Sequence, residues 1–256
     1  MEIQGDVAKL LAGIPIVVEG ANIAITQPKV KDIIAFGEDD FFLAVQLFLS
    51  AAQMAEKIKQ GNTRLELLSD FQVLLVVLDE DKESRDAVGS FFNLIFPDYE
   101  YEFAPGSVNF KVDGRIIGQL NPMDFEAFQT VLRNCFIPFG TKDQQEEEYN
   151  PANEAAAAIA AKLKRGNEIR AKMKAKDNES SSLFATYTSA LSIGLAMDVN
   201  VLLNYTAFQL YDAFRRYNMK EACDFYKKIC STPLMDASKM DEPENWLGDL
   251  YVDNRA

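Results

Sequence analysis

An acidic, polar run near the middle of the chain is the feature that most limits how this sequence can fold. Residues 143–148 read Asp-Gln-Gln-Glu-Glu-Glu, and Asn150-Pro151 follows shortly after. Such a run cannot bury apolar surface, and proline disfavours helical backbone at the residue before it. The net charge of −13 lies entirely in residues 1–150, because residues 151–256 carry 14 basic and 14 acidic side chains. We therefore expect a domain at residues 1–140, an acidic linker at 141–153 and a second domain at 154–256.

The first of these domains has the patterns of a mixed α+β fold. Short apolar runs bounded by turn residues predict strands, and apolar residues three and four apart predict helices. We expect a hairpin and a three-stranded meander, with strands at residues 16–18, 23–26, 99–103, 108–112 and 115–118. The expected helices cover residues 29–36, 38–59, 70–78, 84–96 and 122–135, with Ser69 or Asp70 capping the third and Asn121 capping the last.

The second domain has the pattern of an all-α fold. Helices are expected at residues 154–176, 183–195, 200–217 and 220–230. The predicted fold is therefore an α+β N-terminal domain with small antiparallel β hairpins, followed by an all-α C-terminal domain. The chain as a whole is expected to be mainly helical.

The absence of histidine narrows the chemistry that this chain can perform. It removes Ser-His-Asp and Cys-His catalysis, imidazole metal ligands and histidine proton relays. No phosphate-binding loop, dinucleotide fingerprint or nucleophile elbow occurs in the sequence. The acidic clusters at residues 38–40 and 79–81 fit a helix start and a solvated turn better than a metal site. We expect no enzymatic activity, no catalytic residues, no metal and no cofactor.

Export and membrane insertion are not expected either. The N-terminal residues lack the basic segment of a signal peptide. The longest apolar runs, such as residues 73–78, fall far below the roughly 20 residues needed to span a bilayer. The odd number of cysteines, with no CxxC pair, indicates reduced thiols rather than a disulfide framework; they are Cys135, Cys223 and Cys230.

Residues 154–176 form the most unusual segment of the chain. Seven cations fall within residues 162–176, opposed only by Glu168, and a narrow apolar stripe runs beside them. A solvated helix, an arm that binds a protein partner and a nucleic-acid contact all fit this pattern. The last fits least well, because aromatic residues for base stacking are missing. The candidate partner-binding residues are Lys162, Arg165, Arg170, Lys172, Met173 and Lys174, together with Phe208 and Tyr211 on a later helix.

Four short segments resemble proteins found in tailed bacteriophages and prophages. The first, residues 23–42, combines a strand pattern, Gln27-Pro28, a short helix and an aromatic-rich helix. The others are Tyr-Asn-Pro-Ala-Asn-Glu at residues 149–154 before the basic segment, the aromatic run at residues 205–217, and Pro-Glu-Asn-Trp-Leu at residues 243–247. The stretch after Tyr217 departs from the pattern of that group.

The resemblance implies a phage tail or morphogenesis protein, and specifically a tail assembly chaperone. Such chaperones hold the long helical tape measure protein in solution before the tail tube forms around it. The resemblance therefore implies phage tail proteins as partners, the host cytoplasm as location and no catalytic residues, and it leaves self-association open. One alternative is a virion structural subunit in the neck, tube or baseplate. A second, less well supported, is a regulatory protein that binds nucleic acid.

Reversal of Arg165, Arg170, Lys172 and Lys174 to Glu tests the interpretation of the basic segment as a partner-binding arm. The fold should be unchanged, because exposed charges contribute little to stability. Association with an acidic helical protein should weaken in a salt-sensitive way. A pull-down from nuclease-treated, phage-infected lysate should lose one large helical protein with the variant. Equal protein recovery, with a DNA or RNA gel shift seen only for the wild type, would contradict the interpretation.

Overall fold

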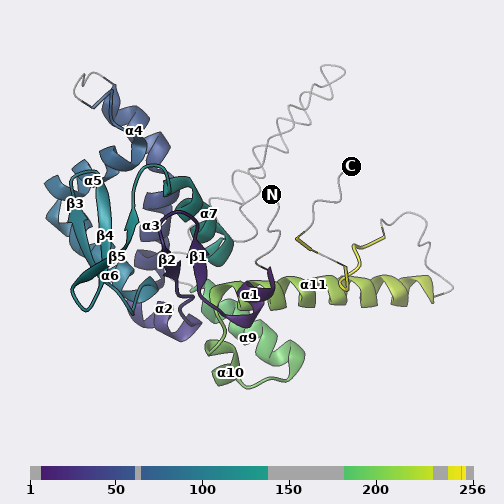
Figure 1. Ribbon diagram of the computed structural model, residues 1–256. Helices are drawn as coiled ribbons and strands as arrows, with labels where there is room; N and C mark the ends of the chain where they lie inside the picture. Colours follow the sequence, from purple (N-terminus) through teal and green to yellow (C-terminus); the bar gives the residue numbers. More distant parts are fainter. Residues whose placement is uncertain (1–6, 61–64, 138–181, 233–241, 249, 252–256) are drawn as a thin grey trace, which may run out of the picture. The chain divides into compact units, whose positions relative to one another are not determined.

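The computed structural model describes residues 7–60, 65–137, 182–232, 242–248 and 250–251 (Figure 1). Contacts within the chain group it into two units, residues 1–138 with 187–256, and residues 139–186. Apart from residues 182–186, all described residues belong to the first unit, which therefore combines much of the predicted C-terminal domain with the predicted N-terminal domain. The acidic linker expected at residues 141–153 lies outside the described residues, so the separation into two domains stays a prediction.

The described residues form a mainly helical fold with two small antiparallel sheets, which confirms the predicted fold class. The strands are β1 (Ile16–Val18), β2 (Ile23–Ile25), β3 (Glu100–Ala104), β4 (Ser107–Val112) and β5 (Arg115–Leu120). The helices are α1 (Val7–Ala12), α2 (Val30–Phe36), α3 (Glu38–Leu49), α4 (Ala51–Lys59), α5 (Asp70–Glu80), α6 (Lys82–Ile95), α7 (Phe125–Phe136), α9 (Leu183–Leu195), α10 (Val199–Leu203) and α11 (Ala207–Cys230).

The single helix expected at residues 38–59 is wrong, because the chain bends by 62° between α3 and α4. Ser50 lies at the bend with a non-helical φ of −97° and ψ of 9°. Its hydroxyl donates to the Gln46 carbonyl at 2.8 Å, a local bond that competes with helical pairing. The side-chain amide of Gln129 in α7 donates to the Phe48 carbonyl at 2.7 Å, so the bend is also held from outside the two helices.

The helix starts were predicted with mixed success. Ser69 caps α5 as expected, since its hydroxyl accepts from the Gln72 amide at 3.2 Å while the Gln72 side chain accepts from the Ser69 amide at 3.0 Å. Asn121 does not cap α7, and the expected start at residue 122 is wrong. Its side chain instead accepts from the Met123 amide at 2.8 Å, which forms a turn, and the helix begins only after Asp124.

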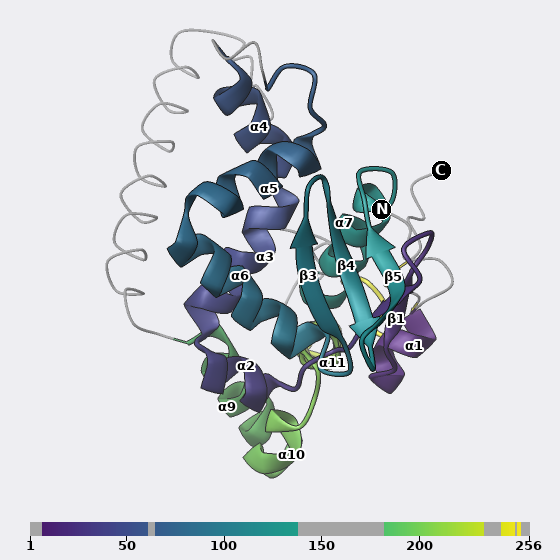
Figure 2. The same ribbon diagram turned by 60° about the vertical axis from the view of Figure 1, so that its left-hand side comes forward.

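The three-stranded sheet is a meander in the order β3-β4-β5, and Figure 2 shows it beside α5 and α6. The turn between β1 and β2 packs on β5 at Gly118. A Cβ atom at Gly118 would lie 2.6 Å from the carbonyl oxygens of both Ala21 and Asn22. The Gln119 amide donates to the Ala21 carbonyl at 2.9 Å, and the Asn22 side chain donates to the Ile117 carbonyl. Glycine at position 118 therefore allows the two sheets to meet.

Phenylalanine rings form the centre of the core. The Phe92 ring of α6 lies 5.5 Å from Phe48 of α3, 6.1 Å from Phe110 of β4 and 6.4 Å from Phe128 of α7. All four side chains are at most 1% exposed. Aromatic pairs of this kind contribute about 0.5–1.5 kcal/mol beyond the area that they bury. This cluster joins two of the long helices and the sheet to α6.

The C-terminal helices break at a different place from the one predicted. A helix over residues 200–217 and a separate one over 220–230 were expected, whereas α10 ends at Leu203 and α11 runs without interruption from Ala207 to Cys230. Thr206 explains the break, because its hydroxyl accepts from the Gln209 amide at 3.3 Å and its own amide donates to the Gln209 side chain at 2.8 Å. This reciprocal pair starts a helix. Asn218 and Glu221 have the spacing of such a pair in the sequence, but α11 continues through them without a break.

Backbone and amide bonds join the start of α11 to the N-terminal elements. The Val30 amide donates to the Tyr205 carbonyl at 2.8 Å, and Lys29 forms an antiparallel bridge with Thr206. The Gln209 side chain donates to the Leu11 carbonyl just before the end of α1. Residues 29–30 and residues 205–206 therefore lie side by side, although some 175 positions separate them in the chain.

In the described part of the chain, no single helix has both the length and the apolar character to cross a membrane. Only α3 and α4 taken together pass such a test, across their 62° bend.

The contact at Gly118 makes the fold sensitive to one added side chain. Gly118→Ala should lower the free energy of unfolding by about 1–3 kcal/mol, because the new methyl group must displace two backbone carbonyls. Urea unfolding followed by circular dichroism measures this change. Gly114→Asn is the control, since a Cβ there meets nothing within 4 Å and asparagine tolerates its φ of +73°. Equal stability of the Gly118 variant and the wild type would contradict the packing argument.

Candidate functional site

Helix α5 is apolar on more than one face, although only one face is covered. Residues 73–78 read Val-Leu-Leu-Val-Val-Leu. Val73 and Leu74 are fully buried against the core, whereas Leu75 and Val76 are only half-buried. A helix that is apolar all round is normally enclosed on all sides. The outer face of α5 is therefore an apolar surface that the core does not fully bury.

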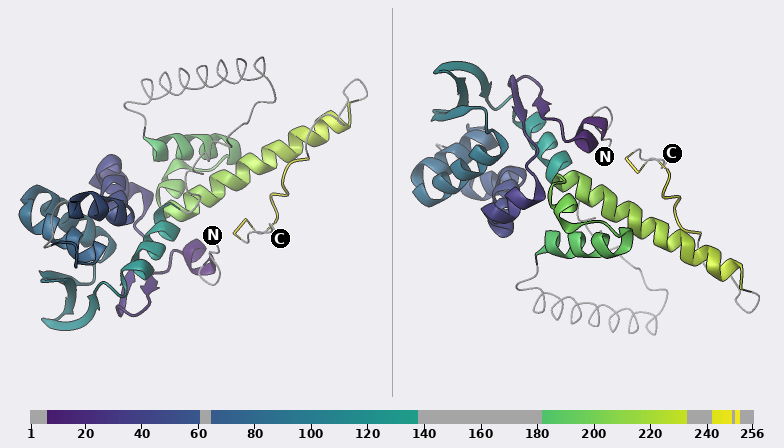
Figure 3. Two further views of the ribbon diagram at one scale, coloured as in Figure 1. Left: turned by 90° about the horizontal axis from the view of Figure 1, so that it is seen from above. Right: turned by 90° about the horizontal axis from the view of Figure 1, so that it is seen from below.

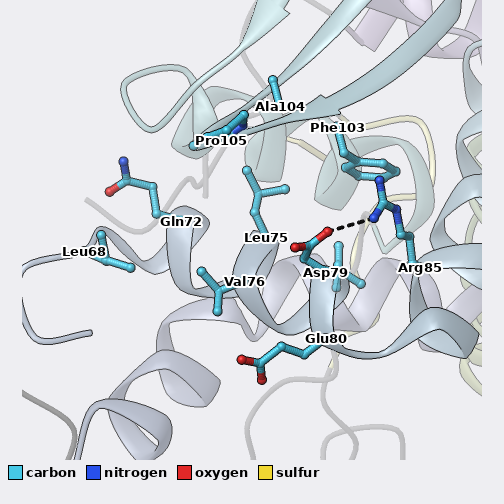
Figure 4. Close-up of a pocket in the computed structure, with 12 residues that line it drawn as sticks. Leu68, Gln72, Leu75, Val76, Asp79, Glu80, Arg85, Phe103, Ala104 and Pro105 are labelled. Atoms are coloured by element: carbon cyan, nitrogen blue, oxygen red, sulfur yellow. Dashed lines mark hydrogen bonds and ion pairs between the residues drawn. The ribbon is translucent and has the colours of Figure 1, made fainter. Parts of the chain in front are cut away.

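This outer face forms one wall of a pocket of about 530 Å³, here called the α5 groove (Figure 4). The opposite wall comes from the end of β3 and the turn that follows it. The lining residues are Leu68 before α5, Gln72, Leu75, Val76, Leu78, Asp79 and Glu80 of α5, Arg85 of α6, and Phe103, Ala104, Pro105 and Gly106 at the β3–β4 turn. The groove is thus apolar along most of its length and charged at the C-terminal end of α5.

An ion pair and an aromatic contact fix the charged end of the groove. The Arg85 guanidinium lies 2.8 Å from an Asp79 carboxylate oxygen and 5.3 Å from the centre of the Phe103 ring. Figure 4 shows the guanidinium placed between these two groups. The pair is well exposed, so its contribution to stability is small. Through these two contacts Arg85 of α6 lies beside both α5 and β3 at this end of the groove.

The chemical character of the groove is that of a binding surface for an apolar segment. Its polar side chains are one amide, two carboxylates and one guanidinium, and its walls are otherwise aliphatic or aromatic. Among the described residues, no group of three or more Cys, Asp or Glu side chains is arranged to hold a metal ion. Pockets of this size and lining take apolar groups and orient them with a few polar contacts.

A second polar cluster joins residues 242–248 and 250–251, here called the C-terminal segment, to α11. The Tyr251 hydroxyl donates to the buried Asp212 carboxylate, and the Arg216 guanidinium lies 3.1 Å from the same carboxylate. Arg216 also donates to the Trp246 carbonyl at 2.8 Å. Burial, and secondly the bond to Asp212, raises the pKa of Tyr251 well above its usual value, so its hydroxyl keeps its proton near neutral pH. Figure 3 shows the C-terminal segment beside α11.

The structure describes only two of the residues predicted to bind a partner. Lys162, Arg165, Arg170, Lys172, Met173 and Lys174 lie outside the described residues. Phe208 is fully buried with its ring 5.5 Å from Tyr251, and Tyr211 is half-buried with its ring 5.8 Å from Tyr187. Burial also raises the pKa of Tyr211. The two side chains thus pack inside the fold on α11, and their role in partner binding stays a prediction.

No family model, curated protein or solved structure matches the chain. Three of the four segments that resemble phage proteins are described, and the structure brings them together. The Val30 amide in segment 23–42 donates to the Tyr205 carbonyl in segment 205–217, and Arg216 in segment 205–217 donates to the Trp246 carbonyl in segment 243–247. These segments therefore make contacts inside the fold, whereas the α5 groove lies elsewhere.

Sequence reasoning did not identify the groove residues as a site. The available signal was the uninterrupted apolar run at residues 73–78, which has no polar face although it fits a helix. The opposite wall could not be found in this way, because residues 103–106 approach α5 only through the folding of the sheet. The acidic cluster at residues 79–81 was interpreted as a solvated turn, whereas the structure places Asp79 and Glu80 in the last turn of α5.

The chain contains one tryptophan, Trp246, in the C-terminal segment, so its fluorescence reports whether this segment is docked on α11. Tyr251→Phe should weaken docking of the C-terminal segment by about 1.5–3 kcal/mol, because it removes a hydrogen bond to a buried carboxylate. Acrylamide should then quench Trp246 fluorescence more strongly than in the wild type. Tyr205→Phe is the matched control, since its hydroxyl makes no side-chain hydrogen bond within the described residues. Unchanged quenching in the Tyr251 variant would show that this bond does not hold the segment.

Proposed function

We propose that the protein is a non-enzymatic phage tail assembly chaperone that holds the tape measure protein in the host cytoplasm during tail morphogenesis. The observation that carries the proposal is the outer face of α5, where Leu75 and Val76 stand half-buried in a groove instead of being enclosed by the core. A holding chaperone needs such a surface, because it must cover apolar side chains of a partner that has not yet reached its final assembly.

Two further properties support the same function. The net charge of −13 favours dispersion of a complex between a chaperone and an aggregation-prone partner. The groove has no set of nucleophile, base and oxyanion donors, which agrees with a role in binding. The resemblance of four segments to phage morphogenesis proteins supplies the identity of the partner class.

The abundance of the protein in particles distinguishes a chaperone from a structural subunit. Quantitative mass spectrometry should find the chain in phage-infected lysate and nearly absent from purified particles. A structural subunit of the neck, tube or baseplate would instead be present in many copies per particle, and that result would overturn the proposal.

Co-expression with the tape measure protein tests whether the groove supplies the binding surface. The wild type should keep the tape measure protein in the soluble fraction, and Leu75→Glu should lose this effect because it places a charge against an apolar partner. Leu43→Glu on α3 is the control, since Leu43 is an exposed leucine that does not line the groove. Circular dichroism of both variants checks that they fold. Equal solubility of the tape measure protein with the two variants would contradict a role for the groove.

A further inference from the structure

The charge around the α5 groove is concentrated at one end. Residues 79–86 contain five acidic and two basic side chains, and they connect the last turn of α5 to the first turns of α6. Arg85, one of the two bases, is already engaged by Asp79 and Phe103. Glu80 lines the groove and is exposed, and its side chain makes no hydrogen bond or ion pair within the described part of the chain. The C-terminal end of a helix adds further negative potential. This end of the groove therefore favours a cation.

The remaining length of the groove favours apolar side chains on a helix. The lining residues of α5 from Gln72 to Glu80 span about 12 Å at the rise of an α-helix, which corresponds to about two turns of a partner helix. They recur at the three- and four-residue spacings whose ridges accept the side chains of another helix.

Addition of a strand is a less suitable mode of binding at this place. Strand β3 lies at one edge of its sheet. Its exposed residues Glu100 and Glu102 are charged, although Glu102 is paired with Lys111 of β4, and Pro105 follows the strand directly. Charged side chains and proline are typical of edges that are protected against pairing with a further strand.

We infer that the α5 groove binds an amphipathic helix of another protein, with two apolar side chains three or four residues apart against Leu75, Val76 and Phe103, and a Lys or Arg about one turn further on beside Glu80. This inference rests on the proposed function, because it specifies the kind of partner segment that the chaperone holds. It also assigns the acidic end of the groove a role in setting the direction of the bound helix.

A model peptide tests the inference without any phage component. The peptide is an N-terminally labelled Ala-rich helix with two Leu four residues apart and a Lys pair one turn beyond, and a second peptide carries Glu in place of Lys. Fluorescence anisotropy with the full chain should show tighter binding of the Lys peptide. Glu80→Lys should weaken that binding roughly fivefold and should tighten binding of the Glu peptide, as expected for one contact between exposed charges.

Two further variants distinguish binding in the groove from a general effect of the protein's net charge on peptide binding. Glu221→Lys on α11 changes the net charge equally but does not line the groove, so it should bind both peptides as the wild type does. Leu75→Gln should weaken both peptides, and near-ultraviolet circular dichroism checks its fold. If Leu75→Gln does not fold, the exchange of peptide preference by Glu80→Lys still decides the matter. Equal effects of Glu80→Lys and Glu221→Lys would overturn the inference.

Other occupants of the groove give different results. A second copy is indicated if the free wild-type chain sediments as a dimer and Leu75→Gln makes it a monomer, and this would overturn the inference. A peptide of the chain's own residues 154–176 that displaces the Lys peptide at lower concentration than any other would do the same. The peptide experiment and the co-expression experiment test different claims. If the chain keeps the tape measure protein soluble but binds neither peptide, the inference fails while the proposed function stands. If the chain binds the Lys peptide as expected but does not keep the tape measure protein soluble, the proposed function fails while helix binding by the groove stands.

Discussion

Burial of the Phe92 ring is the interaction on which most of the described structure depends. Because this ring contacts phenylalanines of α3, α7 and β4, the position of α6 fixes two helices and the sheet at once. Phe103 extends the same cluster outward: its ring lies 6.1 Å from Phe92 and also meets the Arg85 guanidinium. One wall of the α5 groove is therefore an outer layer of the core. A groove built in this way is already formed before a partner arrives, which lowers the entropy cost of binding.

The separation of the two faces of α5 has a physical explanation. Phe71, Leu74 and Leu78 lie three or four residues apart and are buried, so they hold the helix against the core without help from the outer face. Leu75 and Val76 contribute less to folding because they remain half-exposed. Substitutions there should consequently affect the proposed binding more than the stability of the fold.

The sequence predicted those helices, strands and turns that depend on residues close together in the chain. Predictions failed mainly where contacts between distant residues determine the structure. The Ser69 cap, the turns of the hairpin and of the three-stranded meander, and α9 follow from patterns within a few residues. The bend at Ser50 depends partly on Gln129, which lies 79 positions away, and no local pattern reveals such a bond. The start of α11 was missed although the Thr206–Gln209 pair is a local signal, because the apolar stripe continues across it. The groove was missed because its two walls come from separate elements.

At the acidic end of the groove, some carboxylates stabilise the fold and others only contribute negative charge. Asp81 accepts from the Glu83 amide at 3.1 Å and from the Ser84 hydroxyl, and the bond from Ser84 lowers its pKa, so it is ionised while it caps α6. Its removal would leave the first turn of α6 without this cap. Asp79 is likewise engaged by Arg85. Glu80 has no such structural task among the described residues, and it therefore is the position at which charge at the groove can change while the fold is preserved.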